Sequence, residues 1–209
     1  ETSDVIGDRA LGTDPLQVAA LGRATLEGMA RGGVLGCLKH MPGHGRATVD
    51  SHKEMPVVHA SEAELEEDIA PFRALSGHPL GMTGHLMFPA WDGEHPATQS
   101  PTIIEDVIRG AIGFDGLLLT DDIDMEALEG SVPERSERAL AAGCDVTLNC
   151  WAKMPDMEGI ATRNPDLSDP ARARFDRVMD AIGPMPEGFE TSDLIARRDA
   201  FFAAAQDAA

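Results

Sequence analysis

Leu117-Leu118-Leu119-Thr120-Asp121-Asp122 is the stretch of sequence that decides the fold. A short apolar run that ends in acids is typical of a buried strand that emerges at the carboxyl edge of a parallel sheet. Gly116 comes directly before the run, and residues 102–112, further upstream, have helical periodicity. A helix, a glycine-rich connection and a buried strand in this order predict one unit of an α/β fold.

The same unit recurs along the chain. Besides residues 116–120, apolar runs bounded by glycine or polar residues predict buried strands at residues 33–38, 80–85 and 144–150. Helical periodicity is found at residues 14–30, 62–75, 102–112 and 133–142. Asp14 and Ser61 are expected N-caps, and Pro15 suits the first turn of its helix. Strands that alternate with helices indicate a parallel sheet.

The connections between these elements are asymmetric. Those that lead into strands are short and rich in glycine, whereas those that follow strands are longer and carry polar residues. This asymmetry is typical of a (β/α)8 TIM-type barrel, whose active site lies at the carboxyl ends of the strands. A complete barrel has eight strands in about 250 residues. Four visible βα units therefore predict the C-terminal part of a barrel, with the N-terminal strands absent.

The predicted domain organisation follows from this count. Residues 1–150 are expected to be a partial TIM-barrel catalytic domain, and residues 151–209 a C-terminal loop and helices that pack on the same barrel. Within the second part, residues 151–169 look like loop, and helices are expected at residues 170–182 and 192–207. The N-terminal residues read like the middle of a longer protein. Because half a barrel leaves strand edges unpaired, the chain on its own is expected to be unstable or inactive.

Composition excludes several classes of function. The 209 residues include 36 acidic and 17 basic side chains, with a formal net charge of -19. Such a surface repels nucleic acid and anionic lipid, so neither is expected as a partner. The sequence contains neither an apolar run of about 18 residues, as a membrane span requires, nor a signal peptide. The odd number of cysteines, without CxxC spacing, favours a reducing, cytoplasmic location, with Cys37 and Cys144 as small buried apolar groups.

The densest polar cluster follows the first expected strand. It consists of Lys39-His40-Met41-Pro42-Gly43-His44-Gly45 and, after a short gap, Asp50-Ser51-His52. The glycines permit backbone conformations that let this long loop fold back over the barrel mouth. Asp50 and His52 have the i, i+2 spacing that places two side chains on one side of an extended segment. A carboxylate beside an imidazole can orient it and stabilise its cation.

Two other strand ends carry ionisable groups. Asp121 is the first acid after its apolar strand and is expected to face the barrel mouth, while Asp122 is expected to point elsewhere, with a cap of the following helix as a candidate role. His85 has an equivalent place at the end of the second strand. Spacing alone favours catalysis and helix capping equally for the acid pair, since helix N-termini attract acids. Three strand ends that converge on one face favour catalysis.

A metal site is the main alternative. His40, His44, His52, His85 and Asp121 include the ligand types of a barrel metallohydrolase. However, an HxH pair at a strand end is lacking, and Lys39 would repel a cation. Catalysis without a metal is therefore the favoured interpretation, with the histidine cluster of a metallohydrolase as the alternative.

The segment from Lys39 to Gly45, with Asp50-Ser51-His52 after it, resembles the signature of family 3 glycoside hydrolases of the bacterial β-N-acetylhexosaminidase type. The resemblance continues on both sides of the signature and in the family's order. The further matching stretches are Ile6-Gly7-Asp8-Arg9, Gly12 to Pro15, Met82-Thr83-Gly84-His85, Pro96 to Ser100, Gly113-Phe114-Asp115-Gly116 and Thr120-Asp121-Asp122. Family 3 β-glucosidases lack the Asp-Ser-His triplet, which therefore favours the hexosaminidase branch.

This resemblance implies a site and a reaction. Asp121 would be the nucleophile, and His52 the general acid/base, assisted by Asp50. The implied substrate-binding residues are Arg9, Lys39, His40 and His85. The activity implied is a retaining release of N-acetylglucosamine, without a cofactor, from a small carbohydrate such as a muropeptide or chitooligosaccharide, in peptidoglycan recycling. Transfer of the sugar to phosphate instead of water stays open, and so does a non-enzymatic sugar-binding relative, although binding alone needs neither a nucleophile nor an acid/base.

Overall fold

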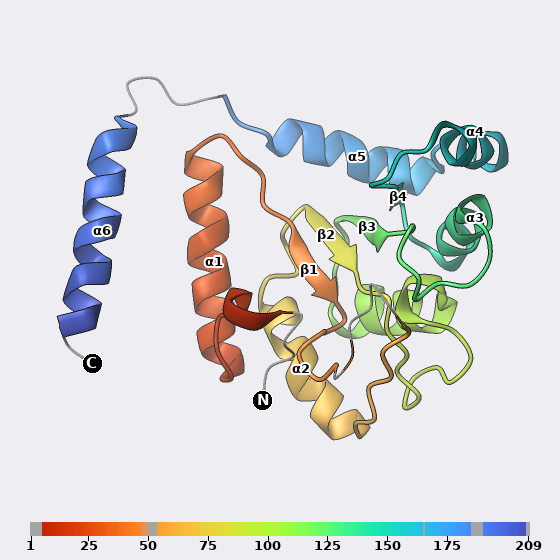
Figure 1. Ribbon diagram of the computed structural model, residues 1–209, viewed down its shortest axis with the longest axis horizontal. Coiled ribbons are helices and arrows are strands. Elements are labelled where there is room, and N and C mark those ends of the chain that lie inside the picture. Colours follow the sequence, from red (N-terminus) through yellow and green to blue (C-terminus); the bar gives the residue numbers. More distant parts are fainter. Residues whose placement is uncertain (1–5, 48, 50–53, 165, 185–189, 208–209) are drawn as a thin grey trace.

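A four-stranded parallel sheet forms the centre of the protein (Figure 1). The computed structural model describes residues 6–47, 49, 54–164, 166–184 and 190–207. The strands are β1 (Leu38–Met41), β2 (Leu80–Thr83), β3 (Leu117–Asp122) and β4 (Val146–Leu148). They lie in the sheet in their order along the chain, and each is parallel to its neighbour. All four carboxyl ends therefore meet at one edge.

Helical segments lie before, between and after the strands. They are η1 (Gly7–Arg9), α1 (Pro15–Arg31), α2 (Glu62–Ala74), η2 (Ala97–Gln99), the π-helix η3 (Ile103–Ala111), α3 (Val132–Ala142), α4 (Met154–Arg163), α5 (Asp169–Ala181) and α6 (Thr191–Asp207). Figure 1 shows α1 and α2 on one side of the sheet and α3, α4 and α5 towards the other, with α6 beyond α1. The predicted α/β fold, with parallel strands alternating with helices, is confirmed.

The helix starts follow from the sequence. The Asp14 side chain accepts a hydrogen bond from the Gln17 amide at 2.8 Å, and Pro15 begins α1. Ser61 and Glu64 form a capping box at the start of α2, so both residues satisfy amides that the first turn leaves free. Both predicted N-caps are confirmed.

The first strand lies later in the chain than expected. The sequence predicted residues 33–38, but β1 comprises Leu38–Met41, with Leu38 opposite Gly81 and Met41 opposite Thr83. Gly33 has φ 75°, a left-handed conformation that turns the chain away from the end of α1. The chain then needs several residues to reach the sheet. Lys39 and His40 consequently belong to the strand itself, and not to the loop after it.

The segment after β4 is also more regular than expected. Residues 151–169 were predicted to be loop, yet they contain the helix α4, which packs on α3. Pro155 suits the first turn of this helix. Gly159 permits the contact, because an added Cβ would lie 2.5 Å from Cγ of Pro133 on α3. The Met, Pro and Asp content that suggested a loop belongs to a short helix stabilised by tertiary packing.

A buried carboxylate fixes the amino-terminal edge of the sheet. Asp145, directly before β4, is 5% exposed. Its Oδ2 accepts hydrogen bonds from the Leu118 amide and from Nη2 of Arg109, both at 2.8 Å. Its Oδ1 accepts one from Nη1 of Arg174 on α5 at 3.0 Å. Arg109 also donates to the carbonyl of Gly116 at 2.7 Å, so η3, β3, β4 and α5 meet at one charge.

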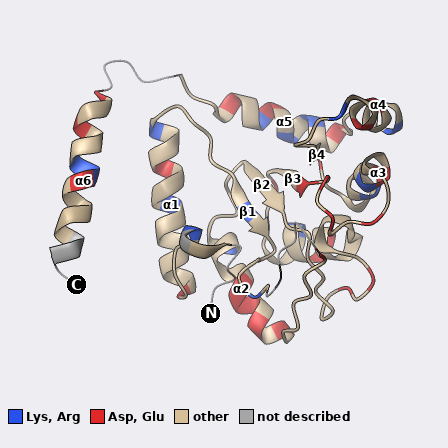
Figure 2. Cartoon of the chain, in the orientation of Figure 1, with Lys and Arg blue, Asp and Glu red and all other residues tan. Residues whose placement is uncertain are grey.

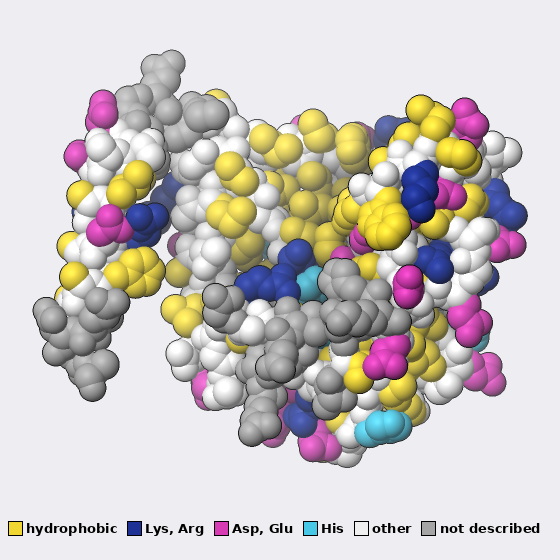
Figure 3. All heavy atoms as spheres, viewed as in Figure 1, with side chains coloured by type: hydrophobic (Ala, Val, Ile, Leu, Met, Phe, Trp, Pro, Cys, Tyr) yellow, Lys and Arg dark blue, Asp and Glu magenta, His cyan; other side chains and the backbone are white. Residues whose placement is uncertain are grey.

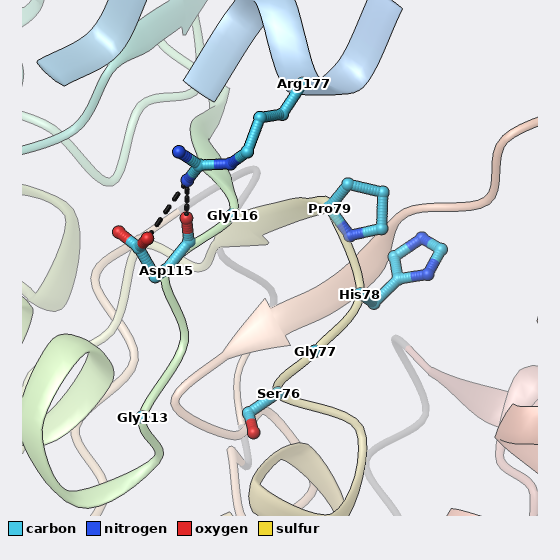
Figure 4. Close-up of a pocket in the computed structure, with 8 residues that line it drawn as sticks. All are labelled: Ser76, Gly77, His78, Pro79, Gly113, Asp115, Gly116 and Arg177. Atoms are coloured by element: carbon cyan, nitrogen blue, oxygen red, sulfur yellow. Dashed lines mark hydrogen bonds and ion pairs between the residues drawn. The ribbon is translucent and has the colours of Figure 1, made fainter. Parts of the chain in front are cut away.

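A cavity of about 340 Å³ lies at this same edge (Figure 4). It is lined by Ser76, Gly77, His78, Pro79, Gly113, Asp115, Gly116 and Arg177. Arg177 reaches from α5 to Asp115 and donates to its carbonyl oxygen at 2.6 Å and to its Oδ2 at 3.0 Å. Pro79 and Gly116 come directly before β2 and β3. The cavity therefore lies at the opposite end of the strands from Asp121.

Replacement of Asp145 by alanine is expected to destabilise the protein by about 3 kcal/mol, because two arginines would lose their shared buried partner. The matched control is Asp199→Ala, which breaks an ion pair with Arg198 whose side chains are 61% and 59% exposed. That control should change the unfolding free energy by less than about 0.5 kcal/mol. Urea unfolding followed by circular dichroism measures both changes. Equal effects of the two substitutions would contradict this account of the amino-terminal edge.

Candidate active site

Asp121 and His40 face one another at the carboxyl edge of the sheet. Oδ2 of Asp121 lies 3.5 Å from Nε2 of His40, and the side chains are 20% and 11% exposed. Oδ1 of Asp121 accepts a hydrogen bond from the Asp122 amide at 2.9 Å, which fixes the orientation of the carboxylate. One carboxylate oxygen is therefore bound by the backbone, while the other faces the imidazole in a partly open site.

Gly84 allows this meeting across the intervening strand. His40 comes from β1 and Asp121 from β3, with β2 between them in the sheet. Gly84 follows β2, and a Cβ at this position would lie 3.1 Å from Cβ of His40 and 2.6 Å from Cδ1 of Leu86. A larger residue would push the imidazole away from β3. The sequence contained this glycine between Thr83 and His85, but only the sheet order gives it a function.

His40 is held in its neutral form. Burial lowers the pKa of its imidazole from 6.5 to about 4, and the positive charges of Lys39 and Arg9 also lower it, against the opposing effect of Asp121. The ring of His44 packs edge-on against that of His40, with centroids 5.5 Å apart. At neutral pH the Asp121 carboxylate therefore faces a neutral imidazole, and His40 does not neutralise its charge.

His85 is enclosed beneath this pair. The residue has no exposed surface, and its Nε2 lies 3.0 Å from the carbonyl oxygen of Asp122, so Nε2 carries the proton. Burial lowers the pKa of His85 and favours the neutral ring. Nδ1 lies 2.8 Å from the Thr98 hydroxyl, which also lies 3.1 Å from the carbonyl oxygen of Gly84, so its one proton is shared between these two acceptors. The ring holds the backbone beside Asp121, and the substrate contact expected of His85 stays a prediction.

Asp122 and Asp124 join the ends of β3 and β4. Oδ1 of Asp122 accepts hydrogen bonds from the Asp124 amide at 3.2 Å and from the Cys150 amide at 3.0 Å. Oδ2 of Asp124 accepts hydrogen bonds from Nδ2 of Asn149 at 2.8 Å and from the Trp151 amide at 3.0 Å. The suggestion that Asp122 caps a helix is wrong, because a turn follows β3 and α3 begins only at Val132. Sequence reasoning gave Asp124 and Asn149 no role.

Positive charge borders the site. Arg9 is an exposed residue of η1 that donates from Nε to the Ile6 carbonyl at 3.3 Å, and Lys39 is exposed on β1. The charges of both act on the imidazole of His40, so both lie near it. Figure 3 shows basic side chains against a histidine near the centre of the face viewed. Asp50 and His52 lie outside the described residues.

Three further observations concern metals, thiols and membranes. The part of the chain that the structure describes contains no group of three His, Cys, Asp or Glu side chains that could hold a metal ion. Burial raises the pKa of Cys37 to about 11 and that of Cys144 to about 12, so both are protonated thiols. Cys144 is buried, as expected, whereas Cys37 is only half-buried. None of the described helices is long and apolar enough to cross a bilayer.

A parallel α/β sheet with a carboxylate and a histidine side by side at its carboxyl edge defines an α/β domain with a candidate active site at its strand ends. The chain belongs to glycoside hydrolase family 3, because the model of the glycosyl hydrolase family 3 N-terminal domain matches residues 1–177. The family predicted from the segment between Lys39 and Gly45 is confirmed.

Individual relatives agree with this family. A β-hexosaminidase of Aromatoleum aromaticum is 41% identical over 184 residues, which cover 84% of this chain and 51% of the relative. The solved structure of NagZ from Neisseria gonorrhoeae in complex with N-trifluoroacetyl-D-glucosamine has a TM-score of 0.76 at 32% identity, over 88% of this chain and 53% of that one. A family 3 β-N-acetylglucosaminidase from Paenibacillus has a TM-score of 0.74 at 30% identity, over 86% and 36%. The chain spans about half the length of the curated relative and of NagZ.

The imidazole of His40 is expected to stay neutral down to about pH 4. An NMR titration that follows the ring signals of His40 as a function of pH measures this. The folded pKa lies below the unfolded value of 6.5, so the contribution of His40 to stability is complete above pH 6.5 and falls as the pH drops towards 4. Asp121→Asn should lower the pKa of His40 further, since the charge that opposes the shift is lost. Asp106→Asn, on exposed surface of η3, is the control and should leave it unchanged. A rise in the Asp121→Asn variant would contradict the geometry.

Proposed function

We propose that the protein acts as a retaining β-N-acetylhexosaminidase that releases N-acetylglucosamine from peptidoglycan-derived fragments in the cytoplasm. The observation that carries the proposal is the Asp121 carboxylate, fixed by a backbone amide on one oxygen and facing neutral His40 with the other. Hexosaminidase relatives and a related structure that binds N-trifluoroacetyl-D-glucosamine support an N-acylated glucosamine as the reacting sugar. No cofactor enters the proposed reaction.

In the first step an oxygen of Asp121 attacks the anomeric carbon as the bond to the leaving oxygen breaks. His52 donates its proton to that oxygen, so the aglycone leaves as a neutral alcohol and the sugar is bound to Asp121 in the α configuration. A cationic His40 would weaken this nucleophile by pairing with it. The lowered pKa of His40 is therefore suited to a carboxylate that must attack.

In the second step His52, now neutral, takes a proton from water as the water oxygen attacks the same carbon. The bond to Asp121 breaks, the carboxylate is restored and the product regains the β configuration. Asp50 is proposed to orient His52 and to stabilise its cationic form, which is present before the first step and restored after the second. A histidine suits both directions because its ordinary pKa lies close to neutral pH.

The proposed substrate contacts come from Arg9, Lys39 and His40. Arg9 and Lys39 are donors with exposed side chains beside the site, which is the arrangement needed to bind sugar hydroxyls or the N-acetyl oxygen. We assign His85 to holding the Asp122 backbone. Its effect on substrate binding would then pass through the carboxyl end of β3. The four strands are proposed to be the C-terminal part of a (β/α)8 barrel, so the assays below use the complete protein that contains this chain.

Asp121→Ala is expected to lower turnover of p-nitrophenyl N-acetyl-β-glucosaminide by roughly 10⁴-fold or more, because the nucleophile is lost. p-Nitrophenyl β-glucoside should be a poor substrate of the unchanged protein. Azide added to Asp121→Ala with an activated 2,4-dinitrophenyl glycoside should restore turnover and give the α-glycosyl azide.

Asp106→Ala, an exposed acid on η3, is the matched control and should have full activity. Preference for the glucoside would place the protein in the β-glucosidase branch. Full activity of Asp121→Ala would remove Asp121 from the reaction.

His52→Ala is expected to lose about 10²–10⁴-fold on substrates whose leaving group needs a proton, as for the loss of a general acid/base. A 2,4-dinitrophenyl glycoside needs no such proton, so the first step should survive while the second is slow. Rapid mixing should then give a burst of dinitrophenol, and mass spectrometry an added N-acetylhexosamine on the peptide that contains Asp121. Equal losses on both substrates, without a burst, would assign His52 a different role.

A further inference from the structure

Trp151 is an exposed indole at the carboxyl edge of the sheet. Its residue is 67% exposed, and it lies on the connection from β4 to α4, shown in teal in Figure 1. Tryptophan normally buries most of its large apolar surface, so this position gains little folding stability from the side chain. The other tryptophan, Trp91, is half-buried and packs against Phe88, with ring centroids 5.4 Å apart.

The backbone of Trp151 is attached to the acids that follow the proposed nucleophile. Its amide donates to Oδ2 of Asp124 at 3.0 Å, and the preceding amide of Cys150 donates to Oδ1 of Asp122 at 3.0 Å. Asp122 in turn donates its amide to Asp121. These hydrogen bonds attach the backbone of Trp151 to the same edge of the sheet as Asp121.

A cation accompanies the indole. Nζ of Lys153 lies 4.7 Å from the centre of the Trp151 ring, within the range of a cation–π contact. Ala152, between them, has φ 48°, a left-handed conformation that alanine rarely adopts. The lysine lies over the ring on the other side of this strained residue. The amides of Cys150 and Trp151 are bonded to the carboxylates of Asp122 and Asp124, so Lys153 is a positive charge on a segment attached to two acids.

We propose that Trp151 and Lys153 bind the leaving-group sugar of the substrate, and that Lys153 selects a sugar that bears a carboxylate. The inference rests on the proposed function and deepens it. An exposed aromatic face can pack against the C–H groups of a pyranose ring, and an ammonium group beside it can pair with an acidic substituent. In peptidoglycan the sugar linked after N-acetylglucosamine carries a carboxyl-bearing ether, which matches this pair. A neutral chitooligosaccharide would use the indole alone.

The kinetic test compares three substrates of the complete protein. N-Acetyl-β-glucosaminyl fluoride has a one-atom leaving group, diacetylchitobiose a neutral sugar, and N-acetylglucosaminyl-N-acetylmuramic acid an acidic sugar. Trp151→Ala should lower kcat/KM for both disaccharides, relative to the fluoride, by about three- to tenfold, as for a lost aromatic contact, mainly through KM. Trp151→Phe should recover most of this ratio. Lys153→Gln should lower kcat/KM, relative to the fluoride, about two- to fivefold for the acidic disaccharide alone, as for a lost exposed ion pair.

The binding test uses tryptophan emission. The chain has two tryptophans, so Trp91→Phe leaves Trp151 as the single emitter among these 209 residues. Any tryptophan in the remainder of the complete protein is replaced in the same way. Acrylamide should quench Trp151 in the free protein, and the acidic disaccharide should protect it, whereas N-acetylglucosamine alone should not. If acrylamide does not quench the emission of Trp151 in the free protein, the inference is overturned, because another segment would then cover the ring.

The outcomes separate the two proposals. If the unchanged protein does not hydrolyse the fluoride, the glycosidase proposal fails, and protection of Trp151 by the disaccharide still supports a sugar-binding rim. If the fluoride is hydrolysed but Trp151→Ala leaves the substrate ratio unchanged, the glycosidase proposal stands and the inference about Trp151 is wrong. An equal effect of Lys153→Gln on the neutral and acidic disaccharides would overturn the selection of a carboxylate.

Discussion

The carboxylate of Asp145 is the interaction on which the arrangement of this domain depends. Two arginines from η3 and α5 and the amide of Leu118 donate to one side chain that is 5% exposed. A buried charge with this many donors is compensated, whereas the same charge without any of them would be costly. The bridge fixes the relative position of β3, β4 and α5 at the amino-terminal edge, opposite the candidate active site.

The carboxyl edge depends on the same two strands. Asp122 and Asp124 join the loop after β3 to the loop after β4, while His85 holds the carbonyl of Asp122. Because β3 is fixed at both ends, Asp121 projects from a rigid strand, and its orientation does not rely on a mobile loop. Active sites on strand ends use this rigidity to hold a reacting group in a productive geometry.

The sequence predicted the elements better than the contacts between them. Periodicity and caps predicted the helices and the parallel α/β order, and the motif with Asp121 and His40 predicted the family. The strand shift at β1 and the helix α4 were missed, since both depend on tertiary packing that local sequence does not encode. For the site, Gly84 and Asp124 acquire their roles only when three strands lie side by side.

Electrostatics resolves an apparent conflict between the chain and its site. Figure 2 shows acidic residues spread over the helices and at the end of β3, and the net charge is -19, yet Arg9 and Lys39 lie beside His40. An acidic surface does little to steer a neutral N-acetylglucosamine unit and would repel an acidic leaving-group sugar, so the proposed site would gain its affinity from short-range contacts. The positive charges of Arg9 and Lys39 also help to keep His40 uncharged, because they lower the pKa of its imidazole. The arrangement thereby places donors beside the site without placing a cation directly on the proposed nucleophile, Asp121.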